Sequence, residues 1–502
     1  LLVLLSQDYD VTLMNPPYGS AGRMPKEVKR YVSQKYTYSP EYYINFFEIG
    51  NRLGKKNSRV SMLVPRSFMF NKSFEQFRID FVSGKGGFDF LAEFGLEILD
   101  NATVRTVGTV IRVDAVAEQR SGRFVRLSDV DGDRKETAFL GAVFNGSQRD
   151  DINRLYEREI SEFELIPSTP LSYWVPKRIR RLFREDTVLD ANQAGLPSRG
   201  SGAEVVTGVK TGKISRFLRN FWEVSHSAGN WVPFPKGGEE TWMLPRVGLC
   251  VNWNKNGSEI ERQPAATQGT KGNYFREGLT YNIEKSNGRR FGIMPKDSIF
   301  SAKGVAIFTG DAPREAVAGY LNSRLITYLV LCLTPERTWQ IGTIAKLPWK
   351  RKLLQKQKLQ KLSERILSSL ATLRESNFVS PHYRGPLMLR MIRETEASEA
   401  YRWHPHRNTG ELPDTLDVPS ANTEMSLERL GIKTAAFRSS VWGDISSAET
   451  KLNTIILKHF NICDDQRDEL LTEIALRTNE DPRKKSTLDA DSITEPPEDF
   501  PK

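Results

Sequence analysis

The sequence predicts an α/β protein whose first domain is the C-terminal half of a doubly wound, Rossmann-like sheet. A mixed α+β domain and a helical C-terminal region follow. Three observations support this prediction: strand and helix patterns alternate over residues 11–115, Trp, Gly and basic residues are dense over 166–348, and Leu and Ile recur at helical spacing after Pro348. At 502 residues the chain is long enough for two or three domains.

The first domain, residues 1–133, shows the alternation most clearly. Short apolar runs predict strands at 11–14, 59–65, 88–94 and 104–115, and apolar residues at steps of three and four predict helices at 42–53 and 67–82. Strand, helix, strand, helix, strand is the order of the second half of a doubly wound sheet.

The turn Asn15-Pro16-Pro17-Tyr18 ends the first of these strands, because a Pro-Pro pair cannot continue a strand. Ligands bind at the carboxyl ends of strands in open α/β sheets. The Asn15 side-chain oxygen and the Pro16 carbonyl are two acceptors for the two hydrogens of a planar amine, and Tyr18 offers a π-face for a heteroaromatic ring. We expect an amine-binding turn here. A Pro-rich turn that only ends a strand is the alternative.

The segment from Tyr9 to Gly19 resembles the catalytic motif of S-adenosylmethionine-dependent amino-methyltransferases, chiefly the N6-adenine DNA methyltransferases. The resemblance implies that Asn15, Pro16, Pro17 and Tyr18 are catalytic, and that the substrate is an adenine flipped out of double-stranded DNA. Val64 to Phe68 is similar to this family at the matching place. An aromatic residue of the family that stacks on the base is replaced here by Leu99, which can pack on a base without offering a π-face.

The cofactor implied is S-adenosyl-L-methionine, but its Gly-rich loop lies well before the catalytic strand in this family. Only 14 residues precede Asn15, so we expect the cofactor-binding half upstream of Leu1, and this chain alone to be inactive. Gly200-Ser201-Gly202 is rejected as a downstream substitute, since no strand precedes it. Gly208 to Lys213 resembles a phosphate-binding loop but has the wrong spacing and no following Ser or Thr, so a nucleotide triphosphatase is excluded.

We expect a linker helix over 134–165 and a second domain over 166–348. Basic residues of its Gly-rich loops suit DNA phosphates and base edges, and the candidates are Lys210, Thr211, Lys213, Arg216, Lys236 and Arg276. The order of the sequence blocks resembles the target-recognition domain of PglX-type adenine methyltransferases of BREX phage-defence systems and of type II G restriction-modification enzymes. A helical region over 349–478 and a disordered tail over 479–502 complete the prediction.

Composition agrees with a nucleic-acid partner. Lys and Arg number 72 against 62 Asp and Glu, a formal net charge of +10. The three cysteines and five histidines lack metal-ligand spacing, so no metal site is predicted, and scarce cysteine fits a cytoplasmic location. The sequence has no run of about 18 apolar residues, so no membrane span is predicted.

Two other functions stay open from the sequence. The chain could be a non-catalytic DNA-binding or specificity protein, acting as a relic or a partner subunit, because half a sheet cannot complete a methyl-donor site. Protein-glutamine methyltransferases also carry the Asn-Pro-Pro-Tyr motif, although nothing in that chemistry calls for a large basic domain. If the chain belongs to an adenine DNA methyltransferase of a phage-defence system, we expect other proteins of that system as partners.

Overall fold

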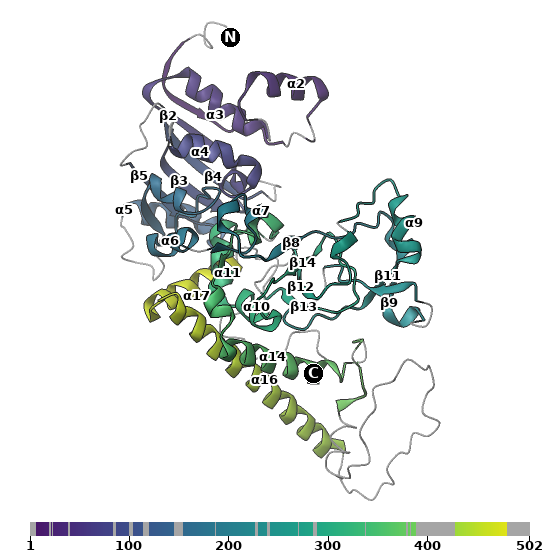
Figure 1. Ribbon diagram of the computed structural model, residues 1–502. Coiled ribbons are helices and arrows are strands. Elements are labelled where there is room, and N and C mark those ends of the chain that lie inside the picture. Colours follow the sequence, from purple (N-terminus) through teal and green to yellow (C-terminus); the bar gives the residue numbers. More distant parts are fainter. Residues whose placement is uncertain are drawn as a thin grey trace, which may run out of the picture. The chain divides into compact units, whose positions relative to one another are not determined.

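The computed structural model describes residues 7–478 apart from several internal segments (Figure 1). The internal residues outside the description are 20–21, 23, 39–40, 84–86, 100–103, 114–119, 145–153, 186, 226–228, 238–240, 270, 285–288, 337, 378–379, 382 and 388–426. The predicted disordered tail, 479–502, also lies outside the described residues.

The chain divides into two compact units. Unit 1 comprises Leu1–Asp186, Leu329–Glu336 and Leu476–Lys485, and unit 2 comprises Thr187–Tyr328, Arg337–Ala475 and Ser486–Lys502. Both units are therefore discontinuous in sequence. Two short stretches from the second half of the chain belong to the unit that carries the Asn-Pro-Pro-Tyr turn.

A six-stranded mixed sheet is the framework of unit 1, with the strand order β1-β2-β4-β3-β5-β6. β1 and β2 are parallel, as are β3 and β5, whereas β4 runs antiparallel to both of its neighbours and β6 runs antiparallel to β5. The strands are β1 (Tyr9–Met14), β2 (Gly54–Pro65), β3 (Phe88–Gly95), β4 (Thr106–Arg112), β5 (Ser121–Arg126) and β6 (Leu155–Glu159).

Helices of unit 1 lie between β1 and β2, between β2 and β3, between β5 and β6, and after β6. They are α2 (Lys26–Lys35), α3 (Tyr42–Leu53), α4 (Glu75–Ser83), α5 (Lys135–Phe144) and α6 (Lys177–Glu185), with 3-10 turns η1 (Arg66–Met69), η2 (Lys72–Phe74), η3 (Gly132–Arg134) and η4 (Ile160–Leu165). Buried aromatic rings of α3, η1 and α4 pack together, including Phe47 with Phe68 and Phe77. α5 packs its Ala138 and Phe139 against Phe90, Ala92 and Phe94 of β3.

The predicted helix over 67–82 is interrupted. Residues 66–74 form two 3-10 turns, and a regular helix begins only at Glu75. The buried Arg78 guanidinium donates hydrogen bonds to the carbonyls of Phe68 and Asn71, both at 2.8 Å. The Arg78 side chain thus gives hydrogen-bond partners to backbone carbonyls that the interruption of the helix leaves without them. The periodicity of apolar residues does not reveal this interruption.

The mixed α/β class with a central mixed sheet confirms the coarse prediction. The segment 134–165, predicted as a linker helix, differs from that prediction: it contains α5 and then β6, which pairs with β5 from Ser121↔Glu159 to Val125↔Leu155. The sequence Leu155 to Glu159 has no clear alternation of apolar and polar residues, and backbone pairing with β5 outweighs the helical preference of its charged residues.

The described residues of unit 2 form three small sheets. The strand orders are β13-β12-β14-β8, β10-β11-β9 and β15-β7, and all of their pairings are antiparallel. The strands are β7 (Thr187–Val188), β8 (Glu204–Val206), β9 (Leu218–Asn220), β10 (Trp231–Pro233), β11 (Leu249–Asn252), β12 (Gly278–Asn282), β13 (Phe291–Met294), β14 (Gly304–Phe308) and β15 (Pro348–Trp349). One buried cluster, which includes Phe217, Trp253, Tyr274, Phe300 and Phe308, joins the four-stranded and three-stranded sheets.

The helices of the second half of the chain are mostly short. They are α7 (Ala191–Ala194), α8 (Ile214–Phe217), α9 (Ser258–Glu261), α10 (Arg314–Leu321), α11 (Arg324–Leu333), α12 (Ile341–Ile344) and α13 (Arg351–Leu354), followed by α14 (Gln357–Arg374), α16 (Leu427–His459) and α17 (Asp464–Thr478). The 3-10 turns are η5 (Pro197–Arg199), η6 (Phe221–Glu223), η8 (Asn254–Gly257) and η9 (Lys271–Asn273). α14 and α16 lie side by side, as Figure 1 shows. α11 and α17 each contribute residues to both units.

No single described helix is both long enough and apolar enough to cross a membrane. The bent pair α10 and α11, at 61° to one another, passes that test only when the two helices are taken together.

Candidate active site

The turn after β1 lies where the sequence predicts it, at the carboxyl end of a parallel strand. β1 ends at Met14, which pairs in register with Met62 of β2, and Asn15 follows directly. Asn15 and Pro17 are exposed, Pro16 is buried and Tyr18 is partly buried. The parallel pairing brings the end of β1 level with the end of β2, so residues from both strands build the site.

Tyr18 connects the turn to β2. Its hydroxyl lies 3.1 Å from Asn15 Oδ1 and 3.0 Å from the Leu63 carbonyl oxygen. A tyrosine hydroxyl has one hydrogen, so it donates to one of these acceptors at a time. Burial raises the pKa of the Tyr18 hydroxyl above its ordinary value of 10.0, which keeps it protonated and able to donate.

Helix α3 packs against the turn through Tyr42 and Tyr43. The Tyr42 backbone N–H donates to the Gly19 carbonyl at 3.1 Å, and the Tyr43 ring meets the Tyr18 ring edge-on with centroids 6.4 Å apart. Tyr43 is fully buried, and its hydroxyl shares a hydrogen bond of 2.9 Å with Ser67 Oγ. A side-chain Cβ at Gly19 would lie 3.0 Å from the Tyr42 ring, so glycine lets the turn approach α3 closely.

The block from Val64 to Phe68 takes part in this support. Pro65 ends β2, and η1 then places Ser67 against Tyr43. Sequence reasoning placed this block after a strand but missed the roles of Tyr43 and Ser67. A tyrosine inside a helix otherwise lined by apolar residues was the available signal, because a buried Tyr hydroxyl needs a partner.

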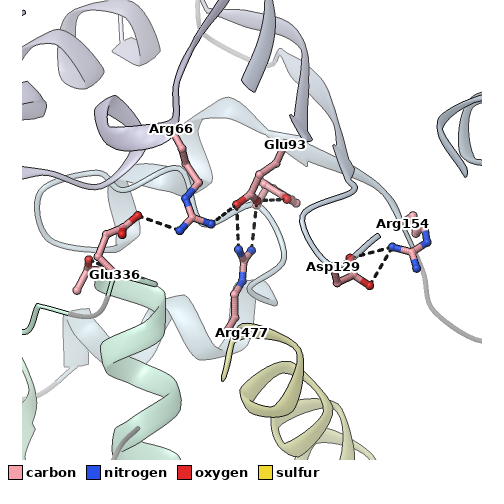
Figure 2. Close-up of polar contacts among 8 residues, drawn as sticks. Arg66, Glu93, Asp129, Arg154, Glu336 and Arg477 are labelled. Atoms are coloured by element: carbon pink, nitrogen blue, oxygen red, sulfur yellow. Dashed lines mark hydrogen bonds and ion pairs between the residues drawn. The ribbon is translucent and has the colours of Figure 1, made fainter. Parts of the chain in front are cut away.

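A buried charge cluster is centred on Glu93 of strand β3, as Figure 2 shows. Glu93 and Arg477 are 0% exposed and Arg66 is 1% exposed. Glu93 Oε1 lies 2.8 Å from Arg66 Nη1 and 3.0 Å from Arg477 Nη1. Arg66 Nη2 also meets Glu336 at 2.9 Å, and the Tyr173 hydroxyl donates to Glu93 at 2.5 Å. Five residues that are far apart in sequence thus converge within unit 1.

Burial alone would raise the pKa of the Glu93 carboxyl. The guanidinium groups of Arg477 and Arg66, with hydrogen bonds from Arg477 and Tyr173, outweigh burial and hold that pKa well below its ordinary value. Glu93 is therefore a carboxylate at neutral pH. Arg477 also stacks its guanidinium on Trp174 at 3.8 Å.

Leu99 lies in the bend that follows β3 and is partly buried. In the sheet, β2 and β4 lie between β1 and β3. At the usual strand spacing of ~4.8 Å, β1 and β3 are therefore about 14 Å apart. Residues 100–103 after Leu99 lie outside the described residues. The predicted contact of Leu99 with a base stays a prediction.

The six predicted DNA-binding residues all belong to unit 2. Lys210, Lys213, Arg216 and Arg276 are exposed, Lys236 is partly buried, and Thr211 is buried. Arg216 forms an exposed ion pair with Glu259 at 3.0 Å, and Arg276 Nη1 donates to Asn273 at 2.7 Å. No metal-binding group of three or more His, Cys, Asp or Glu occurs among the described residues.

Comparison with known proteins places this geometry in context. Residues 4–90 match the family described as Eco57I restriction-modification methylase. Adenine-specific methyltransferase PglX of Lacticaseibacillus casei (strain Zhang) is 26% identical over 394 residues, which are 73% of this chain and 31% of that protein. Adenine-specific methyltransferase BrxX of Escherichia coli O9:H4 (strain HS) is 26% identical over 362 residues, 69% of this chain and 28% of that protein.

A solved structure, the type IIL restriction-modification enzyme MmeI in complex with DNA, aligns with a TM-score of 0.48 and 10% identity, covering 94% of this chain and 57% of that chain. The two sequence relatives confirm the resemblance to PglX-type adenine methyltransferases that the motif and the block order predict. The chain spans less than a third of the length of either relative.

Proposed function

We propose that this chain supplies the amine-binding turn and the DNA-recognition domain of a site-specific N6-adenine DNA methyltransferase in a BREX-type phage-defence or restriction-modification system. The observation that carries the proposal is the turn Asn15–Tyr18 at the carboxyl end of β1, tied to β2 through the Tyr18 hydroxyl. The sequence similarity to PglX and BrxX supports adenine as the amine.

The residues of the turn would act by holding the target amine. Asn15 Oδ1 and the Pro16 carbonyl would accept its two hydrogens, which draws the nitrogen towards sp³ geometry and localises its lone pair. The Tyr18 ring would stack on the base. Because the Asn15 oxygen is then used by the amine, the Tyr18 hydroxyl would donate to the Leu63 carbonyl, which already lies 3.0 Å away.

S-adenosyl-L-methionine would supply the electrophilic methyl group. The described residues of unit 1 do not fit a complete site for it, because no Gly-rich loop joins a strand to a helix N-terminus among them. Gly200 to Gly202 belongs to unit 2 and precedes strand β8, so it is outside the sheet that carries the Asn-Pro-Pro-Tyr turn. The proposal therefore assigns only the amine side of the reaction to this chain.

Unit 2 would bind double-stranded DNA. Its exposed cations Lys210, Lys213, Arg216 and Arg276 suit phosphate contacts, with Thr211, Lys236 and the loops around them as further candidates. Base flipping would bring the adenine to the turn. A cytoplasmic location and other defence-system proteins as partners belong to the same proposal.

Asn15→Ala in the protein expressed from its native gene tests this function. In a host without adenine methylation, we expect the wild-type protein to deposit N6-methyladenine at a fixed sequence, and the variant to lose this activity by a factor of at least about 100, since the amine loses a positioning acceptor. DNA affinity should change little, because phosphate contacts dominate it.

The matched control is Lys55→Gln on β2, outside the motif, where Lys55 forms an exposed ion pair with Asp10 at 2.9 Å. It should methylate like the wild type. Methylation that persists in Asn15→Ala would refute the catalytic assignment, and loss of DNA binding together with methylation would mean that the turn is structural.

A further inference from the structure

Phe275 occupies an unusual position in unit 2. Its side chain is 44% exposed, and its backbone has φ +61°, in the left-handed region. Among the described non-glycine residues with positive φ it is the only aromatic one. An apolar side chain that stays 44% exposed gains only part of the stabilisation that burial gives, and glycine or asparagine would adopt this backbone with less strain. Such outliers cluster at binding sites.

Its neighbours fix this conformation from both sides. Tyr274 is buried with its ring against Trp253 and Phe300, at centroid distances of 5.4 and 5.5 Å. The Phe275 backbone N–H donates to the Ser298 carbonyl at 3.1 Å. Arg276 stacks on the Phe308 ring at 3.9 Å and donates to Asn273. The Phe275 ring is thus presented to solvent on an anchored backbone.

The surrounding segments carry exposed cations. Residues 298–300 pair with the Phe275 backbone and also with Val209, whose N–H donates to the Phe300 carbonyl at 2.9 Å. Exposed Lys210 follows Val209, and exposed Lys296 precedes Ser298 by two residues. An exposed aromatic ring among cations on anchored loops is the arrangement that suits a nucleic acid, since the ring meets bases and the cations meet phosphates.

We propose that Phe275 inserts its ring between base pairs of bound duplex DNA, with Arg276 and Lys210 on the flanking phosphates. This inference rests on the proposed function and adds to it a residue that deforms the DNA. Insertion of an apolar side chain between base pairs unstacks them locally and opens the duplex to bending. Neither composition nor the block order identified this residue.

The test uses the full chain and a pool of random-sequence duplex DNA, from which the wild type selects the duplexes that it binds. Affinity for the selected duplex is then measured for Phe275→Ala and Phe275→Gly. We expect both variants to lose roughly tenfold to a hundredfold in affinity, with the salt dependence of binding unchanged. Phe275→Gly should melt at the same temperature as the wild type or higher, because glycine relieves the backbone.

Asp297→Gly is the matched control, because Asp297 is also exposed with φ +62° and lies next to Ser298. It should bind the duplex at least as tightly as the wild type, because it removes a negative charge beside the proposed surface and leaves the Phe275 ring in place. In the selected duplex, 2-aminopurine at one position should fluoresce more strongly when the wild type binds, and not when Phe275→Ala binds.

Wild-type affinity in both Phe275 variants would overturn the inference and leave the proposed function standing. An equal loss in Asp297→Gly would also overturn it, since the loss would then follow from the backbone alone. A wild type that selects no duplex would overturn the inference and the proposed function together.

Discussion

Tyr18 combines two contributions that substitutions can separate. The ring stacks on the base in the proposed mechanism, and the hydroxyl hydrogen-bonds to Asn15 or to the Leu63 carbonyl. Tyr18→Phe removes only the hydroxyl, so we expect methylation to fall by less than about tenfold, the worth of one net hydrogen bond. Tyr18→Ala also removes the ring, and we expect a further loss of roughly 1–3 kcal/mol, or about fivefold to 150-fold.

The two variants are compared by their methylation activity at limiting DNA, each expressed from the native gene. Equal losses would show that the hydroxyl, rather than the π-face, carries the contribution of Tyr18. Since burial raises the pKa of the Tyr18 hydroxyl, this hydroxyl should stay protonated at neutral and mildly alkaline pH.

At the scale of single residues, much of the candidate site could be predicted. The run Val11 to Met14 and the two prolines place Asn15 at the end of a strand by backbone chemistry alone. The contact between Tyr18 and the Leu63 carbonyl could not be predicted, because it depends on the register of β1 against β2, and the two residues are 45 positions apart. Phe275 could not be recognised either, since its backbone conformation has no signature in sequence.

At the scale of elements, the cluster around Glu93 ties the end of α17 to strand β3. Glu93→Gln removes the charge that compensates two buried guanidinium groups, Arg66 and Arg477. Breaking a buried ion pair in this way costs about 3–5 kcal/mol, so we expect a clearly lower midpoint of thermal unfolding at neutral pH. Arg467→Ala, on the exposed side of α17 with Asp464 and Asp468, is the control and should change the midpoint little.

The same cluster should make stability depend on acid pH. The folded pKa of Glu93 lies below that of an unfolded glutamate, about 4.3. Its contribution is therefore fully present above roughly pH 5 and decreases as the pH falls through 4 and below. The difference in unfolding midpoint between the wild type and Glu93→Gln should shrink from about pH 7 to about pH 3.5. A difference that stays constant would mean that Glu93 is not ionised in the folded protein.

A glutamate within the apolar run Phe88 to Phe94 was visible in the sequence, but its partner was not. Arg477 is 384 positions away. The side-chain period of a strand places Glu93 on the face opposite Ala92 and Phe94, where it needs a compensating charge, but which of the 72 basic residues supplies it is a property of the fold. Strand β4 is a similar case: its residues predict a strand, and its antiparallel insertion between β2 and β3 follows only from tertiary packing.

At the scale of the whole molecule, the division into two units cuts across the sequence order. The sheet unit takes residues 329–336 and 476–485 from the second half of the chain. Glu336 and Arg477 lie within these two stretches and meet the cluster around Glu93. α17 falls in the predicted helical region 349–478 and α11 in the predicted second domain, but neither prediction indicates which unit receives the ends of these helices, because that depends on pairing between residues far apart in sequence.

The net charge of +10 predicts that DNA binding depends steeply on salt. Lys210 is exposed and has no ion pair among the described residues, whereas Arg216 is paired with Glu259. We therefore expect Lys210→Ala to weaken binding of duplex DNA and to reduce the slope of log K against log salt by about 0.9, the value for one phosphate contact. Fluorescence anisotropy with a labelled duplex over a range of salt concentrations measures both quantities.

Lys358→Ala on α14 is the matched control for Lys210→Ala, since it removes the same charge from an exposed helix outside the recognition loops. Its slope should equal that of the wild type, because a lysine that contacts no phosphate releases no counterion on binding. If both variants reduce the slope equally, affinity depends on the overall charge of the chain, and Lys210 has no specific place in the interface. An unchanged slope in Lys210→Ala removes this residue from the DNA-binding surface and leaves the contacts to the other exposed cations of unit 2.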